Sequence, residues 1–419
     1  MAAFARRART RKERVNLNES NPNSRVDVLD SLRAFALSGI LVINAMSILA
    51  VTGSTPAFTV KIPAGERALQ DLILFAVESK FFTLFSLLFG VSFAIQIGSA
   101  KRQGVAFLPR ISRRLATLLL FGLAHIFFLW DGDILVIYAL SGALLVTMRH
   151  LSDRAIRRWI VSLLAAPASL VLVGFIWTLA ARLTPAGAKS LAASDATIVS
   201  SFADTTATQE LLKATWLGGG VARLHTYLEL LPLLLSRIPT VLAMFLLGLA
   251  IGRGDFLGAI GEKSGVLKVV AVRALISGAA VMGLILAATK FLPPTSALIA
   301  IIEDQYIAGP LLCIGYASAF VLAHRARPDA RFFRVLMPMG RMALTNYLLQ
   351  SLVLAWVSYG WGLGLALSLN GYQVLVLSVG LFCAQLLLSR VWLSAFHYGP
   401  CEWLWRCATY RRWMALRLR

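Results

Sequence analysis

Charged side chains are scarce in this sequence: Asp, Glu, Lys and Arg make up 15% of its 419 residues, whereas hydrophobic residues make up 58%. An average soluble domain is about one-quarter charged, so the composition argues against a soluble protein. Several apolar stretches reach the roughly 20 residues that a helix needs to cross a bilayer. Because these stretches do not alternate between apolar and polar residues, they also argue against a transmembrane barrel. The sequence predicts an all-α fold, a polytopic bundle of transmembrane helices in a lipid bilayer.

Cysteine and histidine are also sparse, with four and five residues respectively. The cysteines lack metal-ligand spacing and no His-Glu-x-x-His pattern occurs, so neither a metal site nor a disulfide is predicted. The 41 lysines and arginines outnumber the 20 acidic residues and give a net charge of +21. The basic residues separate the apolar stretches instead of gathering on one soluble domain, so no nucleic-acid partner is expected.

The apolar stretches predict about ten spans, within a range of nine to eleven. Lys and Arg gather in alternate connections, and the positive-inside rule places those connections and both termini in the cytosol. We expect a basic cytosolic tail (1–24), an amino-terminal membrane half (25–181), an extracytoplasmic loop (182–229), a carboxyl-terminal membrane half (230–395) and a basic cytosolic tail (396–419). The spans are expected near 30–50, 72–98, 115–130, 134–148, 159–181, 230–251, 267–289, 306–324, 342–361 and 373–394.

The long connection at 182–229 has the composition of a partly mobile loop. It contains a stretch rich in Ser, Thr, Ala and Asp from Ser190 to Gln209, followed by three consecutive glycines at 218–220. Two interpretations are open, a substrate-facing lid or a plain excursion into solvent. No convincing internal repeat is found, so an inverted-repeat transporter is not favoured.

Polar residues in the first span are the first candidates for a functional site. Asp30 and Arg33 are three residues apart and therefore adjacent on a helix, and Asn44 lies deeper in the same span. Charges at the edge of a span are costly unless they pair or face a cavity, so we predict a substrate-binding role. The alternative is structural, because an acidic residue suits a helix start and an arginine can anchor the span at the head groups.

Five segments are spread over nearly the whole chain: Arg25–Asn44, Phe81–Gly90, His125 with Trp130–Leu135, Gly340–Ser351 and Gly399–Arg406. They resemble segments of the YeiB family of bacterial multi-pass membrane proteins, and the last two resemble that family's C-terminal domain. The family is grouped with membrane acyltransferases, including the heparan glucosaminide acetyltransferase type and the O-acyltransferases of bacterial surface polysaccharides. The resemblance implies a protein of the bacterial plasma (inner) membrane. It also implies acyl transfer from a cytosolic donor such as acyl-coenzyme A, a co-substrate rather than a covalently bound cofactor, to an envelope glycan, lipid or small acceptor.

His125 is the predicted catalytic residue, with Asp131 and Asp133 as its carboxylate partners. Asn44 stands where the polysaccharide enzymes place a histidine, and residues 45–70 lack the histidine that the heparan-type enzymes carry there. His125 lies near the outer end of the third span, just before the two aspartates. A neighbouring carboxylate can orient an imidazole that takes a proton from an acceptor and gives it to a leaving thiolate. The alternative is a histidine that is hydrogen-bonded between helices.

Other polar residues of the spans complete the predicted substrate-binding set. Glu78 and Arg237 are expected at a depth similar to that of His125, where Arg237 contacts an anion or caps the backbone freed by the following proline. Arg341, Asn346 and Gln350 are expected in the cytosolic half. The two amides are four residues apart on one helix face, which also fits a role in bridging helices.

Three functions stay open at this point. The first is acyl transfer across the membrane, from the basic cytosolic end to an acceptor near His125. The second is transport of a small anion or lipid along the same charged groups. The third is a scaffold without catalysis that recruits an envelope partner through residues 182–229. The sequence defines neither donor nor acceptor nor oligomeric state.

Overall fold

The computed structural model describes residues 22–49, 63–253 and 264–418, and within these ranges the chain is helical apart from its turns and one isolated antiparallel bridge between Phe396 and Arg417. Residues 1–21 of the predicted basic tail lie outside the described residues. The helices are α2 (Pro22–Ile48), α3 (Ala64–Ala76), α4 (Lys80–Arg102), α5 (Phe107–Phe128), α6 (Leu135–Met148), α7 (Asp153–Ala181), α8 (Pro185–Ala203), α9 (Thr206–Lys213), α10 (Gly218–Glu229), α11 (Leu231–Leu235), α12 (Ile238–Arg253), α14 (Ser264–Phe291), α15 (Pro294–Asp304), α16 (Ala308–Ala326), α17 (Arg331–Arg341), α18 (Ala343–Ser358), α19 (Gly371–Ala395) and α20 (Pro400–Tyr410).

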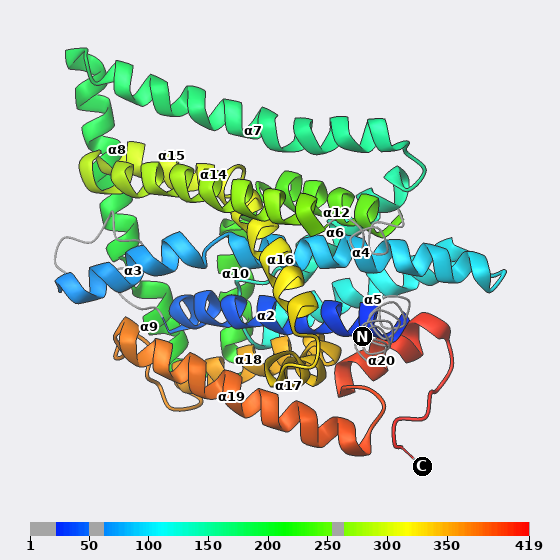
Figure 1. Cartoon of the computed structure of the whole chain (residues 1–419). Coiled ribbons are helices and arrows are strands. Elements are labelled where there is room, and N and C mark those ends of the chain that lie inside the picture. The colour runs from blue at the N-terminus through cyan, green and yellow to red at the C-terminus, as the bar shows by residue number, and fades with distance from the viewer. Residues whose placement is uncertain (1–21, 50–62, 254–263, 419) are drawn as a thin grey trace, which may run out of the picture.

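Eight helical segments are long and apolar enough to cross a membrane, and two shorter apolar helices, α6 and α18, accompany them. Together they coincide with the ten predicted spans, so the prediction of an all-α polytopic bundle is confirmed. The spans lie side by side in Figure 1, with the start of α2 and helix α20 at the same end of the bundle. We call this the basic end, because Lys101 and Arg102 at the end of α4 and the arginine-bearing helices α17 and α20 lie there; the other is the far end.

Two of the spans consist of two longer helices separated by a turn; a third break, at Ser236 and Arg237, only separates the five-residue helix α11 from α12. One consists of α3 and α4, which meet at Val77–Ser79, where Ser79 has a left-handed φ of 61°. The other consists of α15 and α16, which meet at Gln305–Ile307. Such breaks free backbone groups that must find partners inside the protein. The ammonium of Lys80 provides one, because it donates to the carbonyl of Leu74 at 2.9 Å.

The centre of the bundle depends on the close approach of α4 and α12. Gly90 lies against the carbonyl of Phe245, and Gly248 lies against the carbonyl of Leu87, so a side chain at either glycine would overlap backbone atoms. Small residues at such crossings let membrane helices come close enough to gain packing energy along their length. The rings of Phe89 and Phe245 stack beside the crossing, 4.4 Å apart. The two helices thus form a rigid wall next to the site described below.

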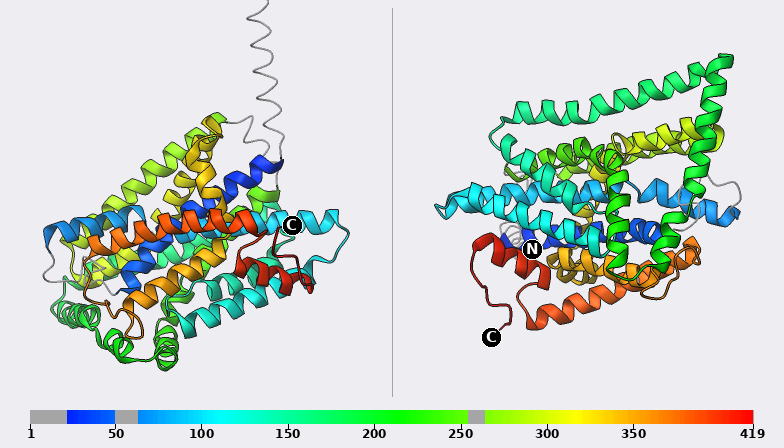
Figure 2. Two further views of the ribbon diagram at one scale, coloured as in Figure 1. Left: turned by 90° about the horizontal axis from the view of Figure 1, so that it is seen from below. Right: turned by 180° about the vertical axis from the view of Figure 1, so that it is seen from behind.

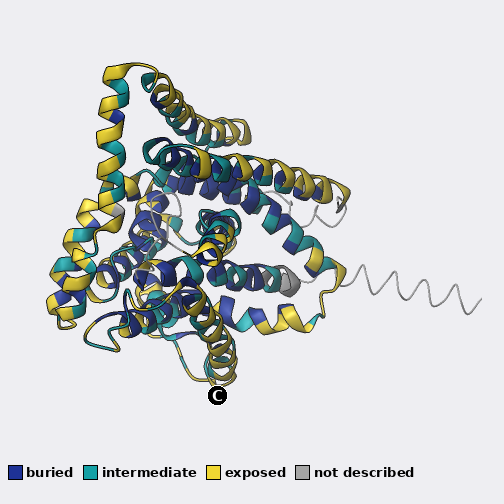
Figure 3. Cartoon of the chain, turned by 90° about the vertical axis from the view of Figure 1, so that its left-hand side faces the viewer, coloured by how far each residue is buried: buried dark blue, intermediate teal, exposed yellow. Residues whose placement is uncertain are grey.

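Burial decreases from the centre of the bundle outward (Figure 3). In the most apolar stretch of α2, 67% of the residues are buried inside the protein, against 6% in α7 and 22% in α19. Helices α7 and α19 therefore present apolar side chains to the surroundings, as lipid-facing helices do, whereas α2 is enclosed. The polar residues of α2 consequently face other helices.

The connection between α7 and α12 differs from the partly mobile loop that its composition predicted. It forms helices α8, α9, α10 and the short α11, and α8 and α10 cross the direction of the spans (Figure 2, right). Thr184 caps α8 by accepting from the backbone N–H of Gly187 at 3.2 Å. Asp195 of α8 pairs with Arg182 at 2.8 Å and accepts from the backbone and hydroxyl of Thr295. These bonds hold the segment against α15, and composition alone did not show them.

Candidate functional site

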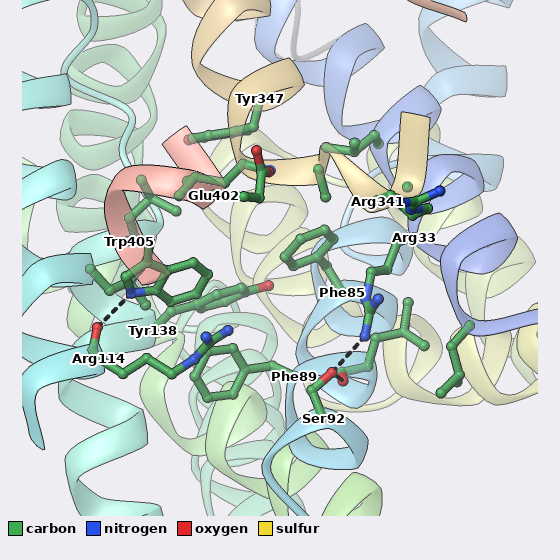
Figure 4. A pocket seen from close by; sticks show the side chains of 18 of the residues that line it. Arg33, Phe85, Phe89, Ser92, Arg114, Tyr138, Arg341, Tyr347, Glu402 and Trp405 are labelled. Atoms are coloured by element: carbon green, nitrogen blue, oxygen red, sulfur yellow. Dashed lines mark hydrogen bonds between the residues drawn. The ribbon is translucent and has the colours of Figure 1, made fainter. Parts of the chain in front are cut away.

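A cavity of about 400 Å³ lies at the basic end, between α2, α4, α5, α17, α18, α20 and the start of α6 (Figure 4). Its wall has two kinds of residue. Four are arginines, Arg33, Arg114, Arg341 and Arg406, and we call their part of the wall the mouth because Arg341 and Arg406 are exposed. Most of the others are apolar or aromatic and include Leu37, Ile40, Phe85, Leu118, Leu135, Tyr138 and Tyr347. Such a cavity suits a ligand with an anionic head and an apolar chain.

Arg33 and Asp30, predicted to pair on α2, do so, and both are held by other helices. Asp30 is buried, pairs with Arg33 and lies within electrostatic reach of Arg341. Arg33 also donates to the hydroxyl of Ser92 on α4 at 2.8 Å (Figure 4). Gly340 packs so closely on the carbonyl of Asp30 that any side chain there would overlap it. The two regions predicted to bind at the cytosolic end are therefore in direct contact.

Arg114 contributes a cation to the cavity without a carboxylate beside it. Its guanidinium lies 3.6 Å from the ring centroid of Trp405, and its buried Nε has no hydrogen-bond partner among the described residues. Trp405 is fixed in turn, because its indole N–H donates to the carbonyl of Arg114 at 2.8 Å (Figure 4). Arg33 and Arg406 lie within electrostatic reach of Arg114. Like charges this close repel one another, so the mouth has excess positive charge for an anion.

Glu402 is the carboxylate in the cavity wall, and it serves α18 rather than Arg406 four residues along. It accepts hydrogen bonds from the backbone N–H groups of Leu344 and Thr345, at 2.7 and 3.1 Å, and from the hydroxyl of Thr345 at 2.5 Å. Free N–H groups at a helix start are satisfied in this way. Burial raises the pKa of Glu402, while its bonds to Thr345 and Leu344 lower it. Glu402 therefore docks α20 onto the start of α18.

His125 and Asp133 form a buried pair at the end of α5. Nδ1 of His125 lies 2.9 Å from Oδ1 of Asp133, and both side chains are fully buried. The other carboxylate oxygen accepts from the backbone N–H of Val136 at 2.8 Å, which fixes the aspartate at the start of α6. Nε2 of His125 has no hydrogen-bond partner among the described residues, and Nδ1 contacts Oδ1 of Asp133 at ion-pair distance without the geometry of a hydrogen bond. An imidazole with a carboxylate beside one nitrogen and no partner on the other has the groups that a general base needs.

Tyr347 connects this pair to the cavity. His125 itself is not in the cavity wall, whereas Tyr347 is, and the two rings are 5.2 Å apart between centroids with a tilt of 38°. Ile134 and Leu135, next in sequence to Asp133, also line the cavity. The apolar end of the cavity thus comes within one aromatic ring of the buried histidine.

Asp131, predicted as a second carboxylate for His125, is placed differently. It lies in the turn between α5 and α6, within electrostatic reach of Arg223 and, more weakly, of His125. Burial raises its pKa to about 6, against the opposing effect of nearby backbone hydrogen bonds and Arg223. Arg223, on α10, donates to the carbonyls of Phe127 and Trp216 at 2.7 and 3.0 Å. Asp133, and not Asp131, is therefore the partner of His125.

Glu78 and Arg237 lie near each other but outside the cavity wall. Glu78 is within electrostatic reach of Asp304, Lys80 and Arg237. Lys80 and Asp304 form a buried ion pair of 2.8 Å between the two broken spans. Arg237 lies over the ring of Phe82, 5.6 Å from its centroid. The sequence predicts Glu78 and Arg237 as substrate-binding residues at the depth of His125, and the structure places them near the pair of Lys80 and Asp304 instead of in the cavity wall.

The remaining predicted residues are packing elements in this structure. Asn346 donates to the hydroxyl of Ser389 at 2.9 Å, and Gln350 donates to Gln385 at 2.8 Å, so both amides bridge α18 to α19 as one interpretation predicted. Asn44 is buried in α2 and is not in the cavity wall.

Sequence reasoning missed Arg114, Trp405 and Tyr347 as parts of one site, and it missed the pair of Lys80 and Asp304. Arg114 fits the general pattern of basic residues beside the apolar stretches, and Tyr347 lies between the two amides of Asn346 and Gln350, so neither residue is conspicuous in the sequence. A signal existed for Lys80 and Asp304, since each is a charge within an otherwise apolar stretch. Nothing in the sequence shows that they face each other across 224 residues.

The fold defines the protein as a multi-pass helical membrane protein, and its polar residues meet inside the bundle. The chain is 30% identical over 414 residues to a protein named "Uncharacterized protein YxaH" from Bacillus subtilis (strain 168), covering 96% of this chain and 98% of that one. It is 29% identical over 404 residues to "Uncharacterized protein YeiB" from Escherichia coli (strain K12), covering 91% and 96%. Residues 251–412 match a family described as "Protein of unknown function (DUF418)". The chain belongs to the YeiB family, as its sequence segments predicted. No solved structure matches it.

Proposed function

We propose that this protein transfers an acyl group from an anionic thioester donor, such as an acyl-coenzyme A, to a hydroxyl or amine of an envelope glycan, lipid or small acceptor at the bacterial plasma membrane. One observation carries the proposal: a single cavity begins among four arginines and ends at Tyr347, against the buried pair of His125 and Asp133.

The donor enters from the basic end. Arg341 and Arg406 are exposed at the mouth, whereas Arg33 is partly buried further in. Guanidinium groups bind phosphate and carboxylate with paired hydrogen bonds, so they suit the anionic part of the donor. The acyl chain follows the apolar wall past Phe85 and Tyr138 toward Tyr347. For His125 to meet the thioester, the ring of Tyr347 turns aside.

The transfer needs a base that can also act as an acid. Nε2 of His125 takes the proton of the acceptor hydroxyl or amine as its oxygen or nitrogen attacks the thioester carbon. The new carbon–oxygen or carbon–nitrogen bond forms, the carbon–sulfur bond breaks, and the proton passes to the leaving thiolate. Asp133 holds the proton on Nδ1 and stabilises the charged imidazole in between.

The test uses the full chain in proteoliposomes with an acyl-coenzyme A carrying a labelled acyl group. Release of free thiol and transfer of label to envelope extract are measured for the wild type, for His125→Gln and for His150→Gln. His150 is an exposed histidine at the turn after α6 and serves as the control. We expect His125→Gln to lose transfer by at least a hundredfold while keeping donor binding, because general acid–base catalysis contributes about 10²–10⁴-fold.

Two results would contradict the proposal. One is transfer by His125→Gln at the wild-type rate, with both variants equally folded by thermal unfolding. The other is uptake of a solute into the vesicles without release of thiol, which would assign the cavity to transport.

A further inference from the structure

A second cavity of about 460 Å³ adjoins the first at the basic end. Gln103, Arg110, Arg406, Tyr410, Arg412 and Met414 line it, and Arg406 and Tyr410 belong to the walls of both cavities. The first cavity is mostly apolar, whereas this one has three arginines among its six lining residues. No acidic residue of the described chain is part of its wall. The two cavities thus share part of their walls, and we call the second, more cationic one the outer chamber.

The outer chamber is built by the carboxyl-terminal tail, which folds back on the bundle. After α20, Arg411 takes a left-handed φ of 53° and reverses the chain. The backbone N–H of His397 then donates to the carbonyl of Leu416 at 2.8 Å, and that of Leu418 donates to the carbonyl of Ala395 at 2.9 Å. The indole of Trp403 donates to the carbonyl of Met414 at 2.8 Å. These bonds hold the tail in place.

The tail is also attached to α5, beside which α20 lies in Figure 2 (left). The Nε–H of Arg113 donates to the carbonyl of Thr409 at 2.8 Å. Arg110 lies 5.2 Å from the ring centroid of Tyr410 and donates to Gln103 at 3.0 Å. Arg110 and Arg406 thus have aromatic or amide neighbours rather than carboxylates, since Arg406 lies over the ring of Tyr398 at 4.6 Å. Guanidiniums oriented this way keep donors free for an external anion.

From this placement we infer that the second cavity binds the phosphate groups of an organic head group whose chain continues into the first cavity. Three guanidiniums around one chamber match a multiply charged phosphate ester, because arginine recognises phosphate through two parallel hydrogen bonds. Tyr410 offers a ring face for a planar group beside the phosphates. Two sources carry this chemistry, a soluble nucleotide-like donor and an anionic phospholipid. The placement of the ligand's apolar chain in the first cavity rests on the proposed function. The phosphate site itself is inferred only from the geometry of the carboxyl-terminal tail.

The experiment measures binding of adenosine 3′,5′-bisphosphate to the purified full chain in nanodiscs of phosphatidylcholine, with adenosine as the uncharged comparison. We expect binding of the bisphosphate and none of adenosine. The double variant Arg110→Ala/Arg412→Ala should weaken it about a hundredfold, since each charged hydrogen bond removed is worth about tenfold or more. Raising the salt concentration should weaken the wild type in the same direction. The matched control is Arg154→Ala/Arg157→Ala, which removes two exposed arginines of α7 away from the cavity.

A second arm distinguishes the source of the phosphate. Native mass spectrometry of wild type and double variant, purified with phosphatidylglycerol, asks whether that lipid is retained by the wild type alone. Retention of phosphatidylglycerol with competition against the bisphosphate supports the site and identifies a lipid head group. Bisphosphate binding without lipid retention supports the site and identifies a soluble donor. Equal binding by the double variant and the Arg154/Arg157 control, or no binding of either phosphate compound, overturns the inference.

The outcome is separable from that of the proposed function. Phosphate binding that depends on Arg110 and Arg412, in a protein that releases no thiol from acyl-coenzyme A, leaves the site standing and removes the acyl-transfer proposal. Acyl transfer by a double variant that binds the bisphosphate and phosphatidylglycerol as well as the wild type does the reverse: it leaves the acyl-transfer proposal standing and overturns the phosphate site.

Discussion

Two groups of charged residues lie inside this bundle, and they are treated in opposite ways. In the cluster between the broken spans, Lys80 is enclosed and each of its donors has a partner: Asp304, the carbonyl of Leu74 and the sulfur of Met282. In the cavity at the basic end, Arg114 has an aromatic ring on one side and open space on the other. The first group is neutralised within the protein, and the second has a surplus of positive charge next to an empty volume.

The contrast shows how to separate structural from functional charges in a membrane protein. Burying charge in a membrane protein costs free energy in both groups, so this cost alone does not show which group is functional. A charge whose partners are all supplied by the fold maintains the fold. A charge that is held in position by a ring or a carbonyl, and that still faces a cavity, has its remaining partner outside the chain. By this criterion we predict a functional role for Arg114 and a structural one for Lys80.

The largest expected effect comes from breaking the closed cluster. Lys80→Met leaves Asp304 buried without its cation, and we expect a loss of about 3–5 kcal/mol in the free energy of unfolding. The double variant Lys80→Met/Asp304→Leu should recover most of that loss, because no charge is then left unpaired. Thermal unfolding in detergent measures both, with Arg406→Ala as the variant that removes an exposed cation of the cavity. A melting temperature lowered equally by Lys80→Met and Arg406→Ala would remove the distinction drawn here.

An intermediate effect on stability is expected from Asp131, in the turn between α5 and α6, and it depends on pH. Burial raises the pKa of Asp131 from its usual 3.8 to about 6, so the folded protein holds a proton that the unfolded chain releases. The stabilisation due to this proton is complete below about pH 4 and is lost as the pH rises through about 6. The melting temperature of the wild type should therefore fall from pH 4 to pH 7 relative to that of Asp131→Asn. Parallel curves for the two proteins would show that Asp131 titrates normally.

The smallest effect is expected from the amides of α18. Gln350→Leu removes one interhelical hydrogen bond to Gln385, and such bonds contribute about 0.6 kcal/mol on average in membrane proteins. We expect a melting temperature within a degree or two of the wild type and unchanged donor binding. A large loss of donor binding in Gln350→Leu would place this residue in the site and extend the functional group beyond the cavity wall.

The spans and the local pairs were predictable from sequence because their signals are local. Apolar length located the spans, and helical spacing paired Asp30 with Arg33. Asp131 and Asp133 were both predicted as partners of His125, and the structure places only Asp133 against it, since the backbone of Val136 fixes that carboxylate and Asp131 lies toward Arg223.

Contacts between distant segments were not predictable in this way. Glu402 and Arg406 are four residues apart on one helix, a spacing that favours a pair, but the backbone N–H groups at the start of α18 hold the carboxylate of Glu402 instead. The cavity itself joins residues from position 29 to position 410, and only the packing of seven segments brings them together. The composition of the long connection did not show the bonds from Asp195 to Thr295 that hold α8 against α15.

The way the chain returns to α19 at its carboxyl end has a practical consequence for anyone who produces the protein. The backbone N–H of Leu418 donates to the carbonyl of Ala395. An affinity tag or fluorescent fusion attached directly after Arg419 would therefore begin close to the bonds that hold Arg412 and Met414 in the wall of the second cavity. We expect a bulky fusion there to break the hydrogen bonds that hold the tail and to disturb the second cavity in a protein that is otherwise folded. Labels are better attached at the amino terminus.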